Sequence, residues 1–192
     1  MAFTRTFIKS LSGGFIIGLG GAVFLSQDNK FLGALMFSLG LLAICTTDQY
    51  LFTGKISYTS DKMFLANVLI GNYIGATFIG WCLHYLKPEY VEKARAICTK
   101  KITSEGFLVV PLGILCNILI YLAVEGYKSG QTVLLILCVM AFILCGFEHC
   151  VANMFYFAVA GMFKLPFILL NVLGNAIGGM VVYKIREVQK FN

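Results

Sequence analysis

The sequence has few charged residues: aspartate, glutamate, lysine and arginine make up 12% of its 192 residues. Soluble domains usually carry about 25%, whereas hydrophobic residues here reach 59%, with a mean hydropathy of +0.85. This composition argues against a water-soluble fold. Because a helix needs about 20 apolar residues to cross the hydrocarbon core of a bilayer, the chain has room for six membrane-spanning helices and no separate soluble domain.

Stretches of alternating apolar and polar residues, the pattern of a membrane β-barrel, are also missing. The apolar runs are instead continuous and rich in glycine. Continuous apolar runs favour membrane-spanning helices over a barrel. No small-residue cleavage pattern follows the first run, at residues 11–26. We therefore interpret this run as the first membrane span and not as a signal peptide.

CxxC pairs are absent, and the seven cysteines lie mostly within apolar runs. An odd number without metal-ligand spacing argues against a disulfide framework and a zinc site. We expect the cysteines to be small buried hydrophobes and the protein to bind no metal or cofactor. A membrane-embedded enzyme or redox carrier would need paired histidines or acids within the spans, and one central histidine with one glutamate is too few.

Charged and turn-like clusters divide the chain into six predicted spans. These cover residues 11–26, 31–53, 64–86, 106–124, 132–160 and 166–184. The side that holds both termini carries 8 lysines and arginines and the other side 7, of which five lie in residues 87–105. Because the bias would be strong without that segment, we place both termini in the cytoplasm.

Two stretches of the sequence repeat each other. Residues 67–75, NVLIGNYIG, resemble residues 171–178, NVLGNAIG, and the GNxIG cores are 103 residues apart. The same offset aligns Phe52 with Phe155, which extends the match to the preceding spans. The alternative is a chance similarity between the small-residue patterns of packed membrane helices.

We interpret residues 1–192 as a single transmembrane domain built from two repeats. Residues 11–86 form the first and 106–192 the second, and 87–105 form an extramembrane connection. Because each repeat has three spans, the second enters the membrane from the opposite side. Such inverted repeats are common among transporters that bind substrate at the bilayer midplane.

Polar residues interrupt the second and fifth spans at matching places. The interruptions are Thr46–Tyr50, TTDQY, and Gly146–His149, GFEH. Irregular backbone at membrane depth needs protein or water to satisfy its polar groups, so we predict two broken helices that border a pore. The free N–H groups at the start of a half-helix would favour an anion there. For the first interruption, an ordinary interfacial loop is the alternative.

His149 is the single histidine well inside a span, since His84 lies near the end of the third. An ionisable residue at this depth is by default a functional candidate. A neutral imidazole can donate a hydrogen bond to an anion, and near neutral pH it can also protonate one. A hydrogen-bonded packing role is the alternative.

Other polar residues leave two readings open. Glu148 is expected to pair with backbone N–H groups or a loop, because its charge would repel an anion. Asn117, in the fourth span, could donate to an anion or to a neighbouring carbonyl. Lys100 and Lys101 could raise the local concentration of anions at a pore mouth or simply form a solvated face.

The segment Gly146–Phe155, GFEHCVANMF, resembles the signature of the formate/nitrite transporter family. Similar motifs at Ser38–Gly40 and Leu51–Gly54, around Asn117 and in both GNxIG cores extend the resemblance over nearly the whole chain. It implies a homopentamer of aquaporin-like protomers, each with its own pore, around a central opening that does not conduct the substrate. It also implies passage of formate, nitrite or hydrosulfide, and in some members of lactate or acetate.

The resemblance further implies roles for individual residues. His149 resembles the central pore histidine and Thr53 the threonine of a mobile loop that can bond to it. Apolar constrictions on either side would exclude hydrated ions. The remaining implied positions are Asn117 and Asn153 as pore-facing asparagines, Phe37 with Phe142 and Leu41 with Ile120 as constrictions, Phe52 beside the loop, and Lys101 in the outer vestibule.

Two features depart from the family pattern. The chain begins almost directly with the first span, so the amphipathic gating helix of many members is expected to be absent or very short. Asp48 stands where other members often carry a small residue. We predict a passive or proton-coupled channel for a small monovalent anion in the inner membrane. A neutral-solute pore like an aquaporin is the alternative, although NPA motifs are missing.

Overall fold

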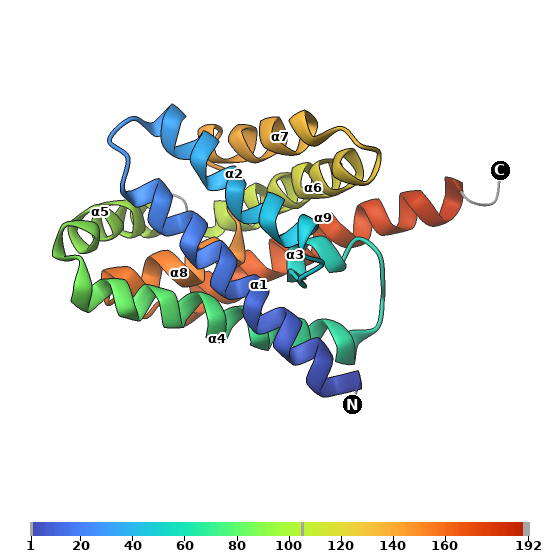
Figure 1. Cartoon of the computed structure of the whole chain (residues 1–192), viewed down its shortest axis with the longest axis horizontal. Helices are drawn as coiled ribbons and strands as arrows, with labels where there is room; N and C mark the ends of the chain where they lie inside the picture. The colour runs from blue at the N-terminus through green and yellow to red at the C-terminus, as the bar shows by residue number, and fades with distance from the viewer. Residues whose placement is uncertain (1, 105, 190–192) are drawn as a thin grey trace.

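The computed structural model describes residues 2–104 and 106–189, and every regular element within these residues is helical (Figure 1). The prediction of an all-helical fold is confirmed. The elements are α1 (Ala2–Leu25), α2 (Lys30–Thr46), α3 (Phe52–Lys55), α4 (Lys62–Leu86), α5 (Pro88–Ser104), η1 (Gly106–Leu108), α6 (Val109–Lys128), α7 (Thr132–Leu144), α8 (Cys150–Ala160) and α9 (Leu165–Gln189).

Four helices of the described part of the chain are long and apolar enough to cross a membrane: α1, α4, η1 with α6, and α9. The helices α2, α7 and α8 are apolar but shorter. The helix α1 begins at Ala2, well before the predicted start at residue 11. Arg5 and Lys9 lie within this helix, because long basic side chains can extend along a helix toward an interface without ending it.

Glycines allow the long helices of each half to pack closely. The helix α1 packs against α4, and α6 packs against α9. A Cβ atom at Gly75 would collide with the backbone carbonyl of Leu11, and one at Gly178 would collide with that of Ile114. These two contacts are equivalent at an offset of 103 residues, as the repeated GNxIG cores predict. Small residues at such sites let membrane helices approach closely.

Both predicted interruptions are breaks between helices. Residues 47–51 separate α2 from α3, and residues 145–149 separate α7 from α8. Each break contains one residue with a positive φ, Asp48 at 50° and Gly146 at 74°. Glycine adopts this conformation freely, and aspartate tolerates it better than most residues do. The requirement for a positive φ explains why position 48 suits a small residue.

Equivalent backbone hydrogen bonds hold the two breaks. In each, one N–H group donates to a carbonyl five residues earlier and the next donates to the first helix of its own half. In the first break, Gln49 donates to Ile44 (3.0 Å) and Tyr50 to Lys9 (3.2 Å). In the second break, Phe147 donates to Phe142 (2.8 Å) and Glu148 to Leu112 (3.3 Å).

An asparagine from each GNxIG core fixes the start of each half-helix. Asn72 accepts from the N–H of Phe52 at 2.7 Å, and Asn175 accepts from that of Cys150 at 2.8 Å. Both amide groups then donate to two carbonyls: Asn72 to Ser10 (2.7 Å) and Tyr50 (2.8 Å), and Asn175 to Gly113 and Glu148 (both 2.8 Å).

These contacts correct one detail of the predicted repeat. Phe52 is equivalent to Cys150, 98 residues later, and not to Phe155. A single aromatic residue in an apolar sequence carries too little information to fix an alignment. The offset changes because the half-helices differ in length: α3 has 4 residues and α8 has 11. The inverted orientation of the two halves stays a prediction.

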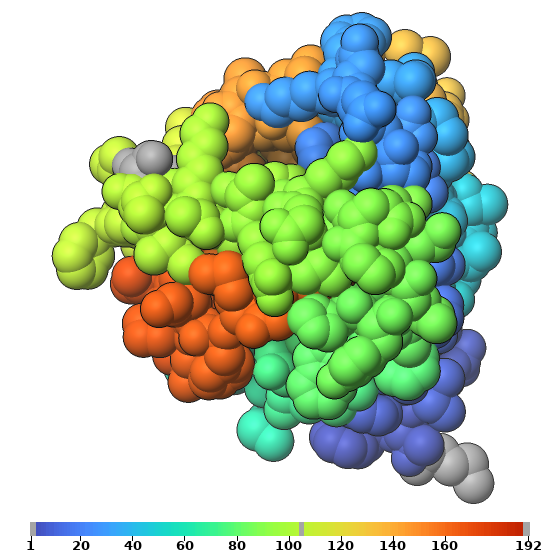
Figure 2. Space-filling view, turned by 90° about the vertical axis from the view of Figure 1, so that its left-hand side faces the viewer, coloured from blue at the N-terminus to red at the C-terminus, as the bar shows by residue number. Residues whose placement is uncertain are grey.

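Residues 87–105, predicted only as a connection, contain the helix α5. Val91, Ala94 and Cys98 are buried at helical spacing, and α5 packs on α8. Proline stands at its first position, where its missing N–H group costs nothing. Figure 2 shows α5 lying across one end of the molecule. The helical spacing of these three apolar residues was visible in the sequence and would have predicted this helix.

Basic residues of α5 bind the ends of other helices. Lys93 donates to the carbonyl of Leu25 at the end of α1 (3.1 Å) and to the carboxylate of Asp28 (2.7 Å). Arg95 donates to the carbonyl of Ala160 at the end of α8 (3.1 Å). Cations at helix C-termini are stabilising because the carbonyl groups there lack partners. Part of the positive charge in this segment is therefore used within the fold.

Candidate functional site

The structure brings His149 and Thr53 together from the two breaks. His149 is the N-cap of α8 and is 3% exposed, and Thr53 lies in α3 and is fully buried. The Nδ1 atom of His149 accepts from the N–H of Ala152 at 3.1 Å, so the proton of the neutral ring lies on Nε2. Nε2 lies 3.0 Å from the Thr53 hydroxyl oxygen and donates to it.

Phe37 and Phe142 lie on one side of this pair. The ring of Phe142 stacks on that of His149, with centroids 5.8 Å apart and planes at 21°. Phe37 meets Phe142 edge to face at 6.2 Å. A cavity of about 190 Å³ opens here, beneath α5; we call it the α5-side cavity. Its lining includes Lys30, Phe37, Lys100, Lys101, Phe142 and His149.

A second cavity of about 450 Å³, the α3-side cavity, lies at the other break. Leu51 and Gly54, which flank Phe52 and Thr53, form part of its wall. The two cavities therefore approach the contact between His149 and Thr53 from different sides. Further lining residues are Leu41, Lys55, Tyr58, Tyr127 and Lys128.

The predicted constrictions are apolar in the structure. Phe37 and Phe142 line the α5-side cavity, and Leu41 lines the α3-side cavity. Ile120 and Phe52 belong to the buried core, at 2% and 5% exposure. The positions agree with walls that would strip water from an ion, and their role as constrictions stays a prediction.

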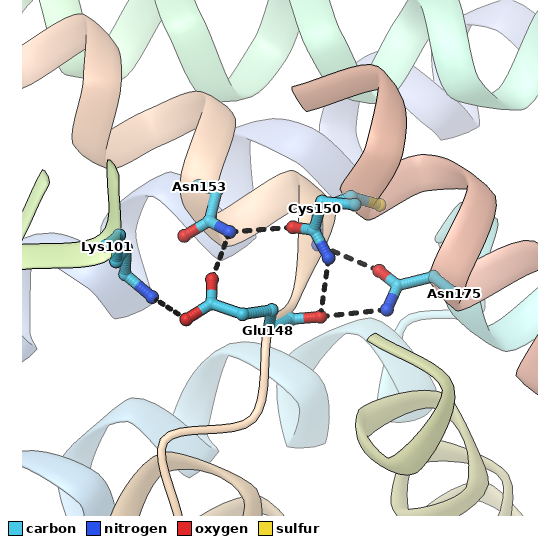
Figure 3. Close-up of polar contacts among 6 residues, drawn as sticks. Lys101, Glu148, Cys150, Asn153 and Asn175 are labelled. Carbon is cyan, nitrogen blue, oxygen red and sulfur yellow. Dashed lines mark hydrogen bonds and ion pairs between the residues drawn. The ribbon is translucent and has the colours of Figure 1, made fainter. Parts of the chain in front are cut away.

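Glu148, next to His149, is fully buried and ion-paired with Lys101 of α5 (Figure 3). Asn153 donates to its other carboxylate oxygen at 2.5 Å. Asn171 and Asn175 both donate to its backbone carbonyl at 2.8 Å. Instead of the expected partners, backbone N–H groups or a loop, the carboxylate pairs with side chains, and one of these, Lys101, belongs to the predicted connection 87–105. An isolated buried charge is costly, and the lysine and the asparagine compensate it.

The side chains of the two remaining predicted asparagines bind partners other than His149. Asn153 donates through its amide group to Glu148 and to Asn171, the latter at 2.7 Å. Asn117 is fully buried and donates weakly to the Ser57 hydroxyl at 3.4 Å, and its Oδ1 has no hydrogen-bond partner in the part of the chain that the structure describes. Their roles as pore-facing asparagines stay predictions.

Sequence reasoning named Asn72 and Asn175 only as members of a repeat, and it did not name Asn171 or Tyr50 as functional. The repetition of the asparagines within the GNxIG cores was the available signal. A side-chain amide accepts through its oxygen and donates two hydrogen bonds through its NH₂ group, so one asparagine can bind a helix N-terminus and two carbonyls at once. The asparagine of each GNxIG core makes these three bonds to backbone groups at and near a break.

Comparisons with known proteins agree with this geometry. The sequence model of the family described as Formate/nitrite transporter matches residues 1–186. The Formate channel FocA of Haemophilus influenzae is 32% identical over 148 residues, which cover 66% of this chain and 52% of that protein. The Formate channel FocA of Escherichia coli K12 is 27% identical over 184 residues, which cover 79% and 64%. The chain thus spans about half to two thirds of the length of these relatives.

Among solved structures, a pentameric formate channel with formate bound superposes on this chain with a TM-score of 0.84. It is 26% identical, and the superposition covers 99% of this chain and 98% of that chain. An ion channel of the FNT family, 22% identical, superposes with a TM-score of 0.80 and supports the same fold.

Proposed function

This chain belongs to the formate/nitrite transporter family, and from that premise we propose that it conducts a small monovalent anion, formate or nitrite, past His149. The observation that carries the proposal is the contact of 3.0 Å between His149 and Thr53, at which the two cavities approach each other. Hydrosulfide, of similar size and charge, is a third candidate substrate.

The proposed path offers an anion neutral hydrogen-bond donors between apolar walls. The ring N–H of His149 and the hydroxyl of Thr53 now bond to each other, and an anion between them would receive a hydrogen bond from each. Hydrogen bonds to an ion are about twice as strong as neutral ones, so this exchange offsets part of the cost of dehydration.

Two features of the neighbourhood favour a negative charge at this point. His149 caps α8, whose first N–H groups and dipole face it. Glu148 would repel an anion, but Lys101 and Asn153 compensate its charge. We propose that this compensation is the main use of Lys101, in place of attraction from an open vestibule.

We further propose a homopentamer in the inner membrane, with one pore in each protomer and both termini in the cytoplasm. The likeness to a pentameric channel over nearly the whole chain supports the assembly. The first turn of α1 and the last turn of α9 lie toward the same end of the molecule, which supports termini on one side (Figure 1).

Flux into proteoliposomes tests the function. We expect formate and nitrite gradients to drive uptake in the natural protein and His149→Phe to lower it about tenfold or more, because a donor to a charged group is lost. His149→Asn is the matched variant, since asparagine keeps the N-cap of α8 but is too short to reach Thr53. It should fold as well as the natural protein and still transport poorly.

The same preparation separates an anion channel from a neutral-solute pore. Uptake of formate and nitrite that persists in both variants would contradict the role of His149. Osmotic swelling in glycerol or urea without anion uptake would identify an aquaporin-like pore. A pH indicator inside the vesicles reports whether a proton accompanies each anion.

A further inference from the structure

Tyr50 occupies the same backbone site as Glu148. Each residue precedes its half-helix by two positions, α3 beginning at Phe52 and α8 at Cys150. Each donates its N–H to the first helix of its half, and each carbonyl accepts from the asparagine of a GNxIG core. The side chains at this one site nevertheless differ, a neutral phenol in one break and a carboxylate in the other.

Both side chains receive a lysine. The Nζ atom of Lys9 lies 4.9 Å from the centroid of the Tyr50 ring, where a cation is attracted by the negative ring face. In the other break, Lys101 forms an ion pair with Glu148. The aromatic face in the first break and the carboxylate in the second thus accept the same kind of partner.

Both side chains also receive a second donor from five residues later, within their own half-helix. Lys55 places Nζ 4.1 Å from the Tyr50 centroid, and Asn153 donates to Glu148 at 2.5 Å. Lys55 and Asn153 are equivalent at the same offset of 98 residues. In each half, this contact therefore connects the half-helix to the break that precedes it.

Thr53 lies in the sequence between Tyr50 and Lys55, whose side chains contact each other. Tyr50 precedes it by three positions and Lys55 follows it by two, so a contact between their side chains restrains the backbone on both sides of Thr53. Phe64 of α4 supports the ring edge to face at 5.7 Å. Because α3 has only 4 residues, it cannot stabilise itself and depends on such contacts.

We infer that Tyr50 is a positioning residue: its ring, held by Lys55 and Lys9, aligns Thr53 with His149, as Glu148 with Lys101 and Asn153 fixes the opposite break. The inference rests on the proposed function for its effect on transport. Lys9 also pairs with Asp48, so in this break the carboxylate lies on the neighbouring loop and the aromatic ring takes its place at the equivalent site.

Replacement of Tyr50 distinguishes a cation-binding role from packing. Tyr50→Phe keeps the ring face and Tyr50→Glu installs the group of the other half, so both should transport formate at about the natural rate. Tyr50→Leu is apolar but binds no cation and should lose about fivefold or more in maximal flux. A packing role gives the opposite pattern, in which phenylalanine and leucine are equivalent and glutamate is inactive, and that pattern overturns the inference.

Lys55→Met tests the partner. Its loss of flux should not exceed that of Tyr50→Leu, which also removes the contact with Lys9. The double variant should be no worse than Tyr50→Leu alone, because the contact between Tyr50 and Lys55 is then already lost. Lys128→Met is the matched control, since Lys128 also lines the α3-side cavity but stacks on Tyr58. An equal loss in this control, or additive losses in the double variant, would mean that cavity charge matters and not the position of Thr53.

Hydrogen exchange of residues 47–55 in detergent tests the inference without transport. The N–H of Phe52 is bonded to Asn72 and should exchange slowly in the natural protein. It should exchange faster in Tyr50→Leu and Lys55→Met and as slowly in Tyr50→Phe and Tyr50→Glu. Unchanged exchange in all four variants overturns the inference. Natural protein that carries no anion refutes only the proposed function.

Discussion

The two ring nitrogens of His149 have separate partners. Nδ1 accepts from Ala152 and caps α8, and Nε2 bonds to Thr53. A second proton on Nδ1 would break the cap, so the folded break itself favours a neutral ring that presents one N–H to the path. A residue that serves structure and transport at once tolerates few substitutions.

Thr53 offers the sharpest test at this scale. Thr53→Val keeps the branched shape and removes the hydroxyl, so we expect formate flux to fall about tenfold because the anion loses one donor. Thr53→Ser restores the hydroxyl and should recover most of the flux. Equal rates for valine and the natural threonine in proteoliposomes would show that the hydroxyl takes no part.

His149 could be predicted because it stands at a polar interruption of an apolar span, whereas Thr53, which follows the other interruption, was predicted from the resemblance to the family. Tyr50 could not be predicted, because an aromatic residue in an apolar sequence looks like packing until the lysines around it are seen. The partner of Glu148 was missed for a similar reason. Lys101 lies 47 residues away on an element whose fold was not anticipated.

At the scale of elements, each break depends on one residue with a positive φ. Gly146, at φ 74°, has nothing within 4 Å of the position that a Cβ would occupy, so only conformation opposes a side chain there. Gly146→Ala should lower the free energy of unfolding by about 1 kcal/mol.

Gly54 provides the control for this prediction. It lies in α3, and its added Cβ would meet Val124 at an ordinary 4.0 Å. Gly54→Ala should therefore leave the thermal midpoint in detergent unchanged or slightly raised. A midpoint that falls equally in both variants would mean that space, and not φ, limits position 146.

The sequence predicts elements unevenly, and the reasons are physical. The long apolar runs predicted an all-helical fold, and the polar interruptions predicted both breaks. The helix α1 begins before the predicted span because charged residues can continue a helix. The equivalence of Phe52 and Cys150 could not be predicted, because hydrogen bonds from Asn72 and Asn175 define it and the sequence shows only that these asparagines recur.

At the scale of the whole molecule, α5 fastens one end of the bundle. It binds the end of α1 through Lys93, the end of α8 through Arg95 and the start of α8 through Lys101. The long connection between the two halves is thus a structural element of the site. Its basic residues compensate helix ends and one buried carboxylate.

The ion pair between Lys93 and Asp28 predicts that the stability of the fold depends on pH. The hydrogen bond and charge of Lys93 hold the pKa of the Asp28 carboxyl below its usual range. A lowered pKa in the folded state means that the pair stabilises the fold above the ordinary carboxyl pKa of about 3.9. This contribution is lost as the pH falls through the lowered value.

Asp28→Asn removes this contribution at every pH. Its thermal midpoint should lie slightly below that of the natural protein at pH 7, and the two midpoints should converge as the pH falls below about 4. Asp61→Asn is the control, because Asp61 caps α4 and lies in another connection. Curves for Asp28→Asn and the natural protein that stay parallel from pH 7 to the acid range would contradict the role of the pair.

The unequal lengths of the two half-helices have a consequence for timing. The 11 residues of α8 are all buried and form about three turns, whereas α3 is a single turn that follows a loop with exposed residues at 47 and 48. A single turn forms and melts on a submicrosecond scale when its tertiary contacts release it. We therefore expect Thr53 to move more than His149, because the single turn that carries it depends on the contacts of Tyr50 with its lysines.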